Sequence, residues 1–588
     1  MRNANFAFYG KQAVIYNNGV IPDTSEELVL SGLFEHVFMD YMQHLRERDS
    51  PLFDIVPKGI SRKKQDSLML MIIRKLTHMR HDEVAMAFPQ AREVFRDTYM
   101  LNEFVEKLYN FWRSFERFFI CYSLEGGGED QEYDKRPYRT FNHTIEILNH
   151  LTRTAYRDIC ENITGEHPRV YRQVAAGCQI GVIAGEKEMP LGKKYANMSA
   201  VPVIRQVFMS PPLILDPTMN KRSGIFREVN ENPLEGVDFT SGEWLCYPAK
   251  VCDTLIHVFF HSRFMGLGTS LANLFDLADD EDLTKKPDAI YAFGVPMKHM
   301  KKYGKNPTVF FEDSKNKIFV GAVPGDDSYG YFGYLKKMIL TLHNIVSIKK
   351  GRLPVHGAMV RISMKNRKTA NVLVWGDSGA GKSETLEAFR MLGKKYIRDM
   401  TVIFDDMGSL GIDSNGKVIA YGTETGAFVR LDDLQPGFAF GNMDRTMIHS
   451  PYTINSRAIL PITTQYEVTK GHEIDFLLYA NNYESVDAEH PILERFSGIE
   501  DALKVFREGA RMAKGTTTET GLVYSFFANP FGPVQYKDEY DRLAKKYFDK
   551  VFASKVFVGQ LRTRLGISGM ETKGPQEAAK ELFRIISG

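Results

Sequence analysis

The feature that most constrains the fold is a glycine-rich segment between an apolar run and a helical pattern. Val372 to Trp375 is a short apolar run with β-branched members, which is typical of a buried strand. The next eight residues, GDSGAGKS, match the pattern G-x-x-x-x-G-K-[ST] in full. Leu386 and Phe389 then follow at helical spacing. The sequence therefore predicts a strand, a tight loop and a helix in succession.

Such a loop has the chemistry of an anion site, and we call it the phosphate cradle. Glycine lets the backbone wrap closely around an anion, and the N-terminus of the following helix adds free N–H groups. Lys382 would neutralise the β- and γ-phosphates of a nucleotide, and the Ser383 hydroxyl would hold Mg²⁺. The residues predicted to bind the nucleotide are Gly376, Asp377, Ser378, Gly379, Ala380, Gly381, Lys382, Ser383 and Glu384.

Composition excludes several classes of partner. The chain has 588 residues, enough for two or three domains, and 75 basic residues against 73 acidic ones. With this balance, the chain has no large net positive charge that would attract nucleic acid or an anionic membrane. The longest apolar run, Leu68 to Ile73, is too short to span a bilayer. The expected partners are therefore a nucleotide and a small-molecule substrate, while the oligomeric state stays open.

Cysteine usage indicates the compartment. The five cysteines are an odd number and form no C-x-x-C pair, which fits a reducing environment and argues against a zinc ribbon. We therefore expect a cytoplasmic protein. His257 and His261 share a face, and we interpret them as lining a half-buried surface rather than binding a metal.

The spacing of apolar residues changes along the chain, and the whole pattern predicts an α/β fold. Apolar spacing of three and four residues predicts helices from about residue 61 to 123 and from 140 to 163. Short apolar runs separated by Gly and Pro begin near residue 171, and YLKKMILTLHNIVSIKKG reads as a helix. The predicted parts are a mainly helical region (1–165), a mixed α/β substrate-side domain (166–350) and a nucleotide-binding catalytic domain (351–588).

Charged residues near the cradle supply what phosphate chemistry requires. Asp405 and Asp406 end a predicted strand, and such carboxylates hold a divalent ion or accept a proton from a hydroxyl. His356 lies at the edge of the strand before the cradle. Downstream are Glu424, Arg430 and Arg457, and guanidinium groups suit a migrating phosphoryl because charge spreads over its three oxygens.

Together these segments resemble the phosphoenolpyruvate carboxykinase superfamily, which also contains HPr kinase/phosphorylase. The similarity preserves order from about residue 318 to 532 and includes GYFGYLKKMILTLHNIV, PVHGAM, IFDDMG, ETGAFVR and INSRAILPI. It implies a two-lobed carboxykinase-like fold with a P-loop mononucleotide-binding C-terminal domain, here preceded by an extra helical region. The cradle itself is closer to the HPr kinase version in Asp377 and Glu384.

The resemblance also implies residue roles. It makes Tyr331, Ser378 and Arg457 substrate residues and gives Lys337, His356, Ser383, Asp405, Asp406 and Glu424 as metal ligands. The catalytic set it implies is Lys337, His356, Lys382, Asp405, Asp406, Arg430 and Arg457. The N-terminal arginine motif that holds a substrate carboxylate in carboxykinases has no clear counterpart, and Arg172, Arg205 and Arg222 are candidates.

Three functions follow as alternatives. The favoured one is a Mn²⁺- and Mg²⁺-dependent carboxykinase that interconverts oxaloacetate with phosphoenolpyruvate and CO₂, using ATP or another donor such as GTP or pyrophosphate. The second is a related kinase for another hydroxyl, on a small molecule or a protein serine, with Asp405 as base. The third is a nucleotide-binding scaffold or sensor without catalysis.

Overall fold

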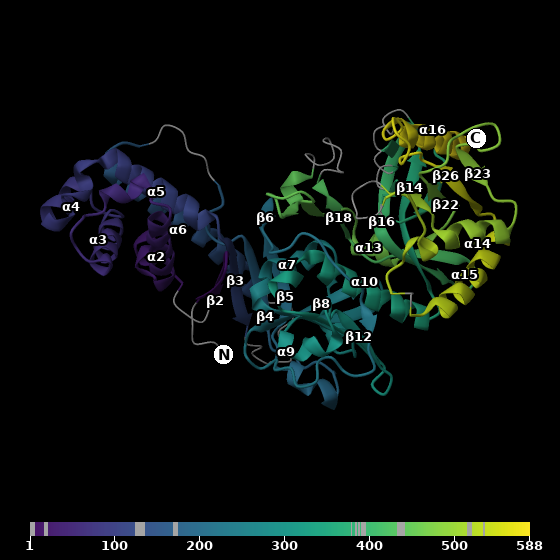
Figure 1. Cartoon of the computed structure of the whole chain (residues 1–588), viewed down its shortest axis with the longest axis horizontal. Coiled ribbons are helices and arrows are strands. Elements are labelled where there is room, and N and C mark those ends of the chain that lie inside the picture. Colours follow the sequence, from purple (N-terminus) through teal and green to yellow (C-terminus); the bar gives the residue numbers. More distant parts are fainter. Residues whose placement is uncertain are drawn as a thin grey trace. The chain divides into compact units, whose positions relative to one another are not determined.

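The computed structural model of the 588-residue chain divides into two compact units, each described here by itself (Figure 1). Unit 1 comprises residues 1–186 and 202–213, and unit 2 comprises residues 187–201 and 214–588. The structure describes all residues except 1–5, 17–20, 124–135, 168–173, 378, 383–384, 386–387, 390–395, 432–441, 514–519 and 533–534. Within the described part, no helix is long and apolar enough to cross a membrane. The three-part division expected from the sequence stays a prediction.

Unit 1 combines a helical bundle with a five-stranded sheet. The helices bury one apolar core, to which Phe38, Ile73 and Phe104 contribute. The strand order is β1-β2-β3-β4-β5, with parallel pairing only on both sides of β3. The elements are β1 (Phe6–Tyr9), β2 (Gln12–Tyr16), α1 (Ser25–Leu30), α2 (Gly32–Glu47), α3 (Arg62–Lys75), α4 (His81–Ala87), α5 (Thr98–Arg113), β3 (Glu116–Ser123), α6 (Arg136–Thr164), β4 (Ile180–Gly185) and β5 (Val203–Met209).

The helical pattern predicted from about 61 to 123 is confirmed as far as Arg113 and is wrong beyond it. The helical pattern assigned up to residue 123 ends at Arg113, and the following segment is strand β3. Phe118, Phe119 and Ile120 are consecutive and all buried, which a strand covered on both faces permits and a one-sided helix does not. The helix predicted from 140 to 163 is present as α6.

Unit 2 contains two large sheets, and α10 (Phe332–Lys349) contacts strands of both. α10 is buried almost all round, as expected for a central helix. In the first sheet the order is β8-β9-β11-β13-β12-β7, with β10 beside β8. Its strands are β7 (Arg227–Glu228), β8 (Trp244–Val251), β9 (Thr254–His261), β10 (Asp276–Leu277), β11 (Ala289–Val295), β12 (Val309–Asp313) and β13 (Ile318–Pro324). The short helices α7 (Met265–Ser270), α8 (Asp280–Leu283) and α9 (Met297–Met300) connect them.

The second sheet carries the predicted cradle. Its order is β21-β17-β16-β14-β15-β22-β26-β23, a mixed arrangement in which β15 is parallel to β22 and antiparallel to β14. The strands are β14 (Leu353–Met364), β15 (Thr369–Trp375), β16 (Ile397–Ile412), β17 (Val418–Gly422), β21 (His472–Glu473), β22 (Phe476–Asn481), β23 (Leu493–Arg495) and β26 (Phe557–Arg562). The helices that follow are α13 (Gln465–Thr469), α14 (Ile499–Glu508), α15 (Lys537–Phe552) and α16 (Lys573–Ser587).

Smaller strands complete unit 2. β18 (Gly426–Arg430), β20 (Arg457–Pro461) and β19 (Met447–His449) form an antiparallel ladder, and β24 (Arg511–Met512) pairs with β25 (Leu522–Val523). β6 (Leu213–Leu215) lies at the boundary between the units. The mixed α/β class expected from the sequence is confirmed.

Candidate active site

The register of the second sheet brings the predicted site residues to one level. Gly357 in β14 lies opposite Trp375, the last residue of β15, and opposite Asp406 in β16. His356 therefore lies between the start of the cradle and the acidic pair, and its carbonyl accepts a hydrogen bond from Gly376 N at 3.0 Å. Local apolar patterns predict these strands, and their pairing aligns residues that are 50 positions apart in the chain.

The described part of the cradle has the backbone that its glycines predict. Gly379 and Gly381 have φ values of +79° and +102°, which glycine adopts without strain. A Cβ on Gly381 would lie 2.8 Å from Thr563 Oγ1. Lys382 is 6% exposed, and its Nζ donates to Gly376 O at 2.6 Å across the loop. The predicted residues Ser378, Ser383 and Glu384 lie outside the described residues.

Asp377, within the cradle, anchors the loop to the rest of unit 2. Its Oδ2 accepts hydrogen bonds from Arg511 Nε at 3.0 Å and Ser525 Oγ at 3.1 Å, and its Oδ1 lies 3.5 Å from His356 Nδ1. Burial raises the pKa of Asp377, but the charges of His356, Arg511 and Lys382 outweigh this effect and lower it. Asp377 is therefore held ionised as a fixed negative charge inside the cradle.

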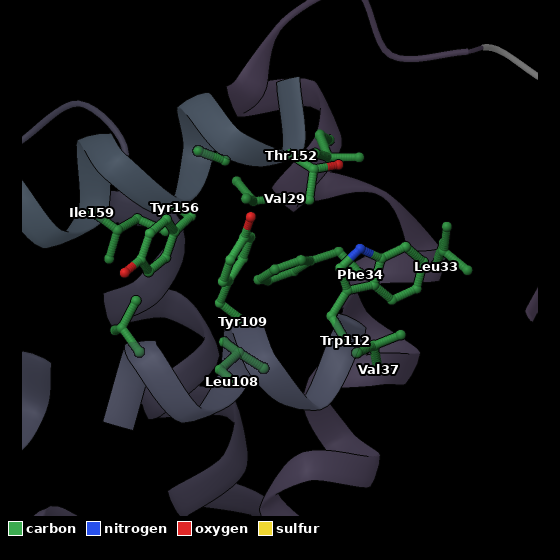
Figure 2. A pocket seen from close by; sticks show the side chains of 13 residues that line it. Val29, Leu33, Phe34, Val37, Leu108, Tyr109, Trp112, Thr152, Tyr156 and Ile159 are labelled. Carbon is green, nitrogen blue, oxygen red and sulfur yellow. The ribbon is translucent and has the colours of Figure 1, made fainter. Parts of the chain in front are cut away.

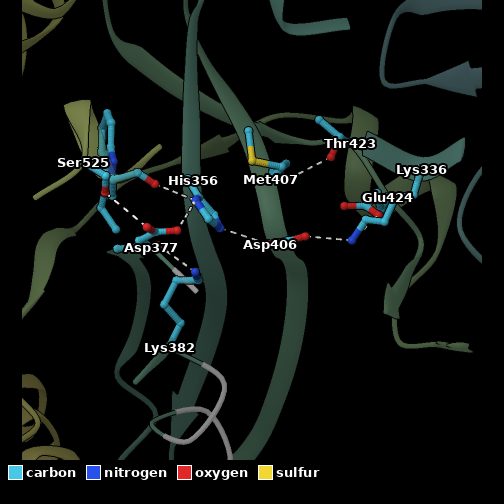
Figure 3. Close-up of polar contacts among 12 residues, drawn as sticks. Lys336, His356, Asp377, Lys382, Asp406, Met407, Thr423, Glu424 and Ser525 are labelled. Carbon is cyan, nitrogen blue, oxygen red and sulfur yellow. Dashed lines mark hydrogen bonds and ion pairs between the residues drawn. The ribbon is translucent and has the colours of Figure 1, made fainter. Parts of the chain in front are cut away.

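His356 and Asp406 meet with a geometry that favours a cation between them (Figure 3). His356 is fully buried, and its Nδ1 lies 2.6 Å from Ala528 O. Because a carbonyl only accepts, Nδ1 must carry a proton, and in neutral imidazole Nε2 then presents a lone pair. That Nε2 lies 3.1 Å from Asp406 Oδ1, which is also an acceptor. A second proton or a metal ion resolves this conflict, and such a backbone contact is typical of metal-binding histidines.

The backbone of Asp406 is strained in a way that aims its carboxylate. Its φ is +111°, uncommon for a residue with a Cβ and costly by about 1–3 kcal/mol. The ladder between β14 and β16 also has a register irregularity near Val360, close to the acidic pair. Strain of this kind persists only where surrounding contacts fix it, and it gathers at functional sites.

Lys336 joins Asp406 to a buried acid, Glu424 (Figure 3). Lys336 Nζ lies 2.7 Å from Asp406 Oδ2 and 3.1 Å from Glu424 Oε1, and both Lys336 and Glu424 are 1% exposed. Burial lowers the pKa of Lys336, but the two carboxylates raise it further than burial lowers it. Despite burial, Lys336 and His356 hold the pKa of Asp406 well below its ordinary value. The ammonium and the Asp406 carboxylate are therefore both charged.

Glu424 has fewer hydrogen-bond partners among the described residues than Asp377 or Asp406. Neither of its oxygens has hydrogen-bond geometry with a partner among the described residues. Burial raises its pKa to about 8, with Lys336 opposing and Asp406 adding to the rise. Thr423, the residue before it, donates to Met407 O at 2.9 Å and ties this segment to β16. A buried carboxyl with open acceptor positions fits a site where a further cation or donor binds.

The two adjacent lysines of α10 make other contacts than the sequence predicts. Lys337, the predicted metal ligand, has its Nζ 4.9 Å from the Phe531 ring centroid and makes no ion pair with the residues described. Burial and the charge of Arg222 lower its pKa to about 8. Lys336, which contacts the acids, was missed. Its role depends on the rotation of α10 about its axis, which the KK dipeptide does not reveal. The ligand role of Lys337 stays a prediction.

The predicted phosphate arginines face each other on the small ladder. Arg430 in β18 lies directly opposite Arg457 in β20. Like charges placed opposite each other are unfavourable unless an anion offsets them. The Arg457 guanidinium lies 5.3 Å from the Phe428 ring centroid, and its Nε is buried without a hydrogen-bond partner in the described structure. Lys336 Nζ lies 5.7 Å from the same ring, so the arginines adjoin the acidic cluster.

The remaining predicted residues also lie here, with some additions. Tyr331 is buried, its ring centroid is 6.1 Å from that of Phe428, and the charges of Arg457, Lys336 and Arg222 oppose the rise in its pKa caused by burial. Asp405 is half-buried beside Asp406. Sequence reasoning missed the roles of Arg511 and Ser525, which are more than 130 residues from Asp377 in the chain.

The metal ligands remain predictions. Within the described ranges, no three His, Cys, Asp or Glu side chains are close enough together to hold a metal ion. The predicted set includes Lys337 and Ser383, which belong to none of these residue types. No protein-family model matches the chain, and no curated protein matches it.

Proposed function

We propose that the protein is a nucleotide- and metal-dependent phosphotransferase of the phosphoenolpyruvate carboxykinase type, with the two-lobed fold of that superfamily. The reaction is the interconversion of oxaloacetate with phosphoenolpyruvate and CO₂. The observation that carries the proposal is that the end of β15, His356 in β14 and Asp406 in β16 lie at one level of three adjacent strands, while Lys382 Nζ donates to Gly376 O at the start of the cradle. Phosphoryl transfer needs this combination of an anion cradle and a charged group beside it.

The chain's own residues supply binding and charge compensation. Lys382 Nζ, which donates to a backbone carbonyl of its own loop, would turn to the β- and γ-phosphates when a nucleotide binds. Arg430 and Arg457, opposed on neighbouring strands, would contact the oxygens of the migrating phosphoryl. Asp377 holds the cradle in place through Arg511.

The residues present fit a divalent ion. His356 Nε2 and Asp406 Oδ1 face each other as acceptors, Lys337 lies close by, and Ser383 follows the cradle lysine. His356, Asp406 and Lys337 would hold Mn²⁺, and Ser383 would hold Mg²⁺ with the nucleotide. Mn²⁺ bound there supplies Lewis-acid polarisation of a substrate oxygen. Lys336 keeps the Asp406 carboxylate ionised and oriented for this purpose.

One observation favours the alternative, a kinase acting on another hydroxyl. The lysine that contacts the acids is Lys336, and its ammonium already neutralises part of their charge without a metal. Asp405, which precedes Asp406 in the chain, would then serve as the general base for a hydroxyl of a small molecule or a protein serine.

An assay of the purified protein separates these functions. Wild type is supplied with Mn²⁺, phosphoenolpyruvate, bicarbonate and either ADP, GDP or phosphate, and oxaloacetate is measured by coupled reduction with NADH. The carboxykinase proposal expects oxaloacetate with at least one acceptor. No oxaloacetate with any of them contradicts it.

Lys382→Ala tests whether the cradle is the active site. Loss of the cation that contacts the phosphates should lower turnover by at least about 10²–10³-fold, the range for one electrostatic donor. The matched control is Lys545→Ala, which removes an exposed lysine of α15. Turnover near the wild-type rate in Lys382→Ala would refute the assignment.

A further inference from the structure

Two cavities of unit 1 contain no residue of the proposed active site. Figure 2 shows the smaller one, a pocket between α1, α2, α5 and α6 that is lined by side chains such as Val29, Phe34 and Leu108. Its volume is about 70 Å³, well below the range of about 300–1,000 Å³ typical of ligand sites. The second is a cleft of about 730 Å³, which lies within that range. The cleft is therefore large enough for a small-molecule ligand.

The cleft lies between α2, the C-terminal half of α5 and two turns of the chain. Residues three or four positions apart share one face of a helix. Asp40 and His44 have this spacing on α2, and Arg48 continues it directly after the helix ends. Lys107 and Phe111 have it on α5. The lining residues are Gly10, Lys11, Asp40, Tyr41, His44, Leu45, Arg48, Ser50, Pro51, Leu52, Lys107, Phe111, Ser114 and Phe115.

An aromatic cluster forms part of the lining. The Phe111 ring centroid lies 5.2 Å from that of His44, 5.5 Å from that of Tyr41 and 5.5 Å from that of Phe115. Tyr41 and Phe115 are buried, whereas Phe111 and His44 are only half-buried and keep ring surface accessible. Aromatic rings pack well against a further planar ring in offset or edge-to-face geometry. This side of the cleft therefore favours a ligand with a planar ring.

Two hydroxyl groups of the lining have already donated their protons within the protein. The Tyr41 hydroxyl donates to Phe104 O at 2.9 Å, and Ser114 Oγ donates to Phe111 O at 2.7 Å. Recognition of a polar ligand group therefore falls mainly to the charged side chains of the cleft.

The charged side chains give the cleft an excess of positive charge. The side chains of Arg48 and Lys107 are exposed, and neither has a hydrogen bond or ion pair with a residue that the structure describes. Lys11 adds a third cation. Asp40 is the one acid among the described lining residues, and its Oδ2 lies 3.5 Å from His36 Nε2. Arg48 and Lys107 are thus two cations without an anion to pair with.

We propose that this cleft binds a small molecule that carries a planar ring and one phosphate group. The ring would pack on Phe111 and His44, and the phosphate would bind Arg48 and Lys107. A phosphate monoester carries about 1.5 to 2 negative charges at neutral pH, which matches the two unpaired cations. A carboxylate would offset only one of them, and a neutral ring would offset neither.

The test is calorimetric titration of the full-length protein with naphthyl phosphate, naphthoate, naphthol and inorganic phosphate. We expect naphthyl phosphate to bind at least about tenfold more tightly than each of the others, because it alone uses both the aromatic cluster and both cations. Equal or tighter binding of naphthoate or naphthol would overturn the phosphate part of the proposal. Equal or tighter binding of inorganic phosphate would overturn the ring part, and binding of none of the four would overturn both.

Variants locate the binding. The double variant Arg48→Gln and Lys107→Gln should weaken naphthyl phosphate by about tenfold or more and leave naphthol unchanged. The matched control is Lys63→Gln, an exposed lysine of α3 that does not line the cleft, and it should change neither. Lys382→Ala should also leave the affinity for naphthyl phosphate unchanged, because the cradle is not the site proposed here.

Thermal unfolding without ligand checks that each variant folds, which we expect because Arg48, Lys107 and Lys63 are all exposed. Unchanged affinity for naphthyl phosphate in the folded double variant would overturn the proposal. Loss of that affinity in Lys382→Ala alone would place the binding at the cradle and would overturn it as well.

Discussion

The two units treat buried positive charge in opposite ways. In unit 2, Lys336 contacts Asp406 and Glu424, and Arg511 contacts Asp377, so both of these buried cations have acidic partners. In unit 1, Arg117 is 2% exposed, and its guanidinium donates hydrogen bonds to three backbone carbonyls. Buried groups that form ion pairs can be held ionised and fixed in place, as a catalytic site requires. A buried cation whose hydrogen bonds go to neutral carbonyls keeps an uncompensated charge and fixes the backbone around it.

The largest loss of stability should come from breaking the ion pairs of Lys336. Lys336→Met removes the ammonium and leaves the buried Glu424 and the partly exposed Asp406 without it. Breaking a buried pair typically costs about 3–5 kcal/mol. The matched control is Lys337→Met, one residue on, where no ion pair to a described acid is lost and we expect a change within about 1 kcal/mol. Urea unfolding followed by tryptophan fluorescence measures both, and equal losses would contradict the pairing.

The arginine ladder extends the comparison to catalysis. Arg457→Ala should lower turnover by roughly 10²–10³-fold and change nucleotide affinity far less, because its guanidinium acts where charge develops in transfer. Steady-state kinetics with a separate binding titration distinguish the two effects. If affinity falls and turnover at saturation does not, Arg457 is a ground-state contact only. Arg445→Ala, an exposed arginine before β19, is the control.

Much of this site could be predicted from the sequence, because its signals are local. The cradle lies in one continuous segment, and apolar patterns mark β15 and α10. β3 was assigned wrongly because its aromatic run continues the helical spacing of α5, and only pairing with β2 and β4 makes it a strand. Pairing of this kind depends on residues far away in the chain.

The rest could not be predicted, for related reasons. The choice between Lys336 and Lys337 is set by how α10 lies against β16, and a helix turns about 100° between neighbouring residues. The bond from Arg511 to Asp377 joins residues 134 positions apart. Local sequence carries no information on either. The pocket of unit 1 likewise depends on four helices that meet only in the folded chain.

A buried histidine of unit 2 contrasts with these paired charges. His257 in β9 is fully buried, and neither ring nitrogen has a hydrogen-bond partner among the described residues. Burial lowers its pKa to about 4, while an unfolded chain has a histidine pKa of about 6.5. Between these values the unfolded state binds more protons, so stability is full above about pH 6.5 and falls as the pH drops towards 4.

That pKa shift predicts that the free energy of unfolding falls by about 3 kcal/mol between about pH 6.5 and pH 4. His257→Phe should remove this part of the pH dependence, because the unfolded chain then gains no proton at this position. His143→Phe, an exposed histidine of α6, should keep the slope. The measurement is the free energy of unfolding in urea at several pH values, and an unchanged slope in His257→Phe would show that other groups cause it.

The smallest effect concerns a neutral hydrogen bond of unit 1. Trp112 Nε1 donates to Ala176 O at 2.6 Å. Trp112→Phe keeps an aromatic ring but leaves that carbonyl without this donor, at a cost of about 1–2 kcal/mol. Trp244→Phe in β8 is the control, because its indole has no such bond to a described residue and only packing is lost. Urea unfolding followed by far-ultraviolet circular dichroism compares them without relying on the replaced fluorophore. A loss at Trp112 no larger than at Trp244 would mean that packing, and not the bond to Ala176, holds α5 against this segment.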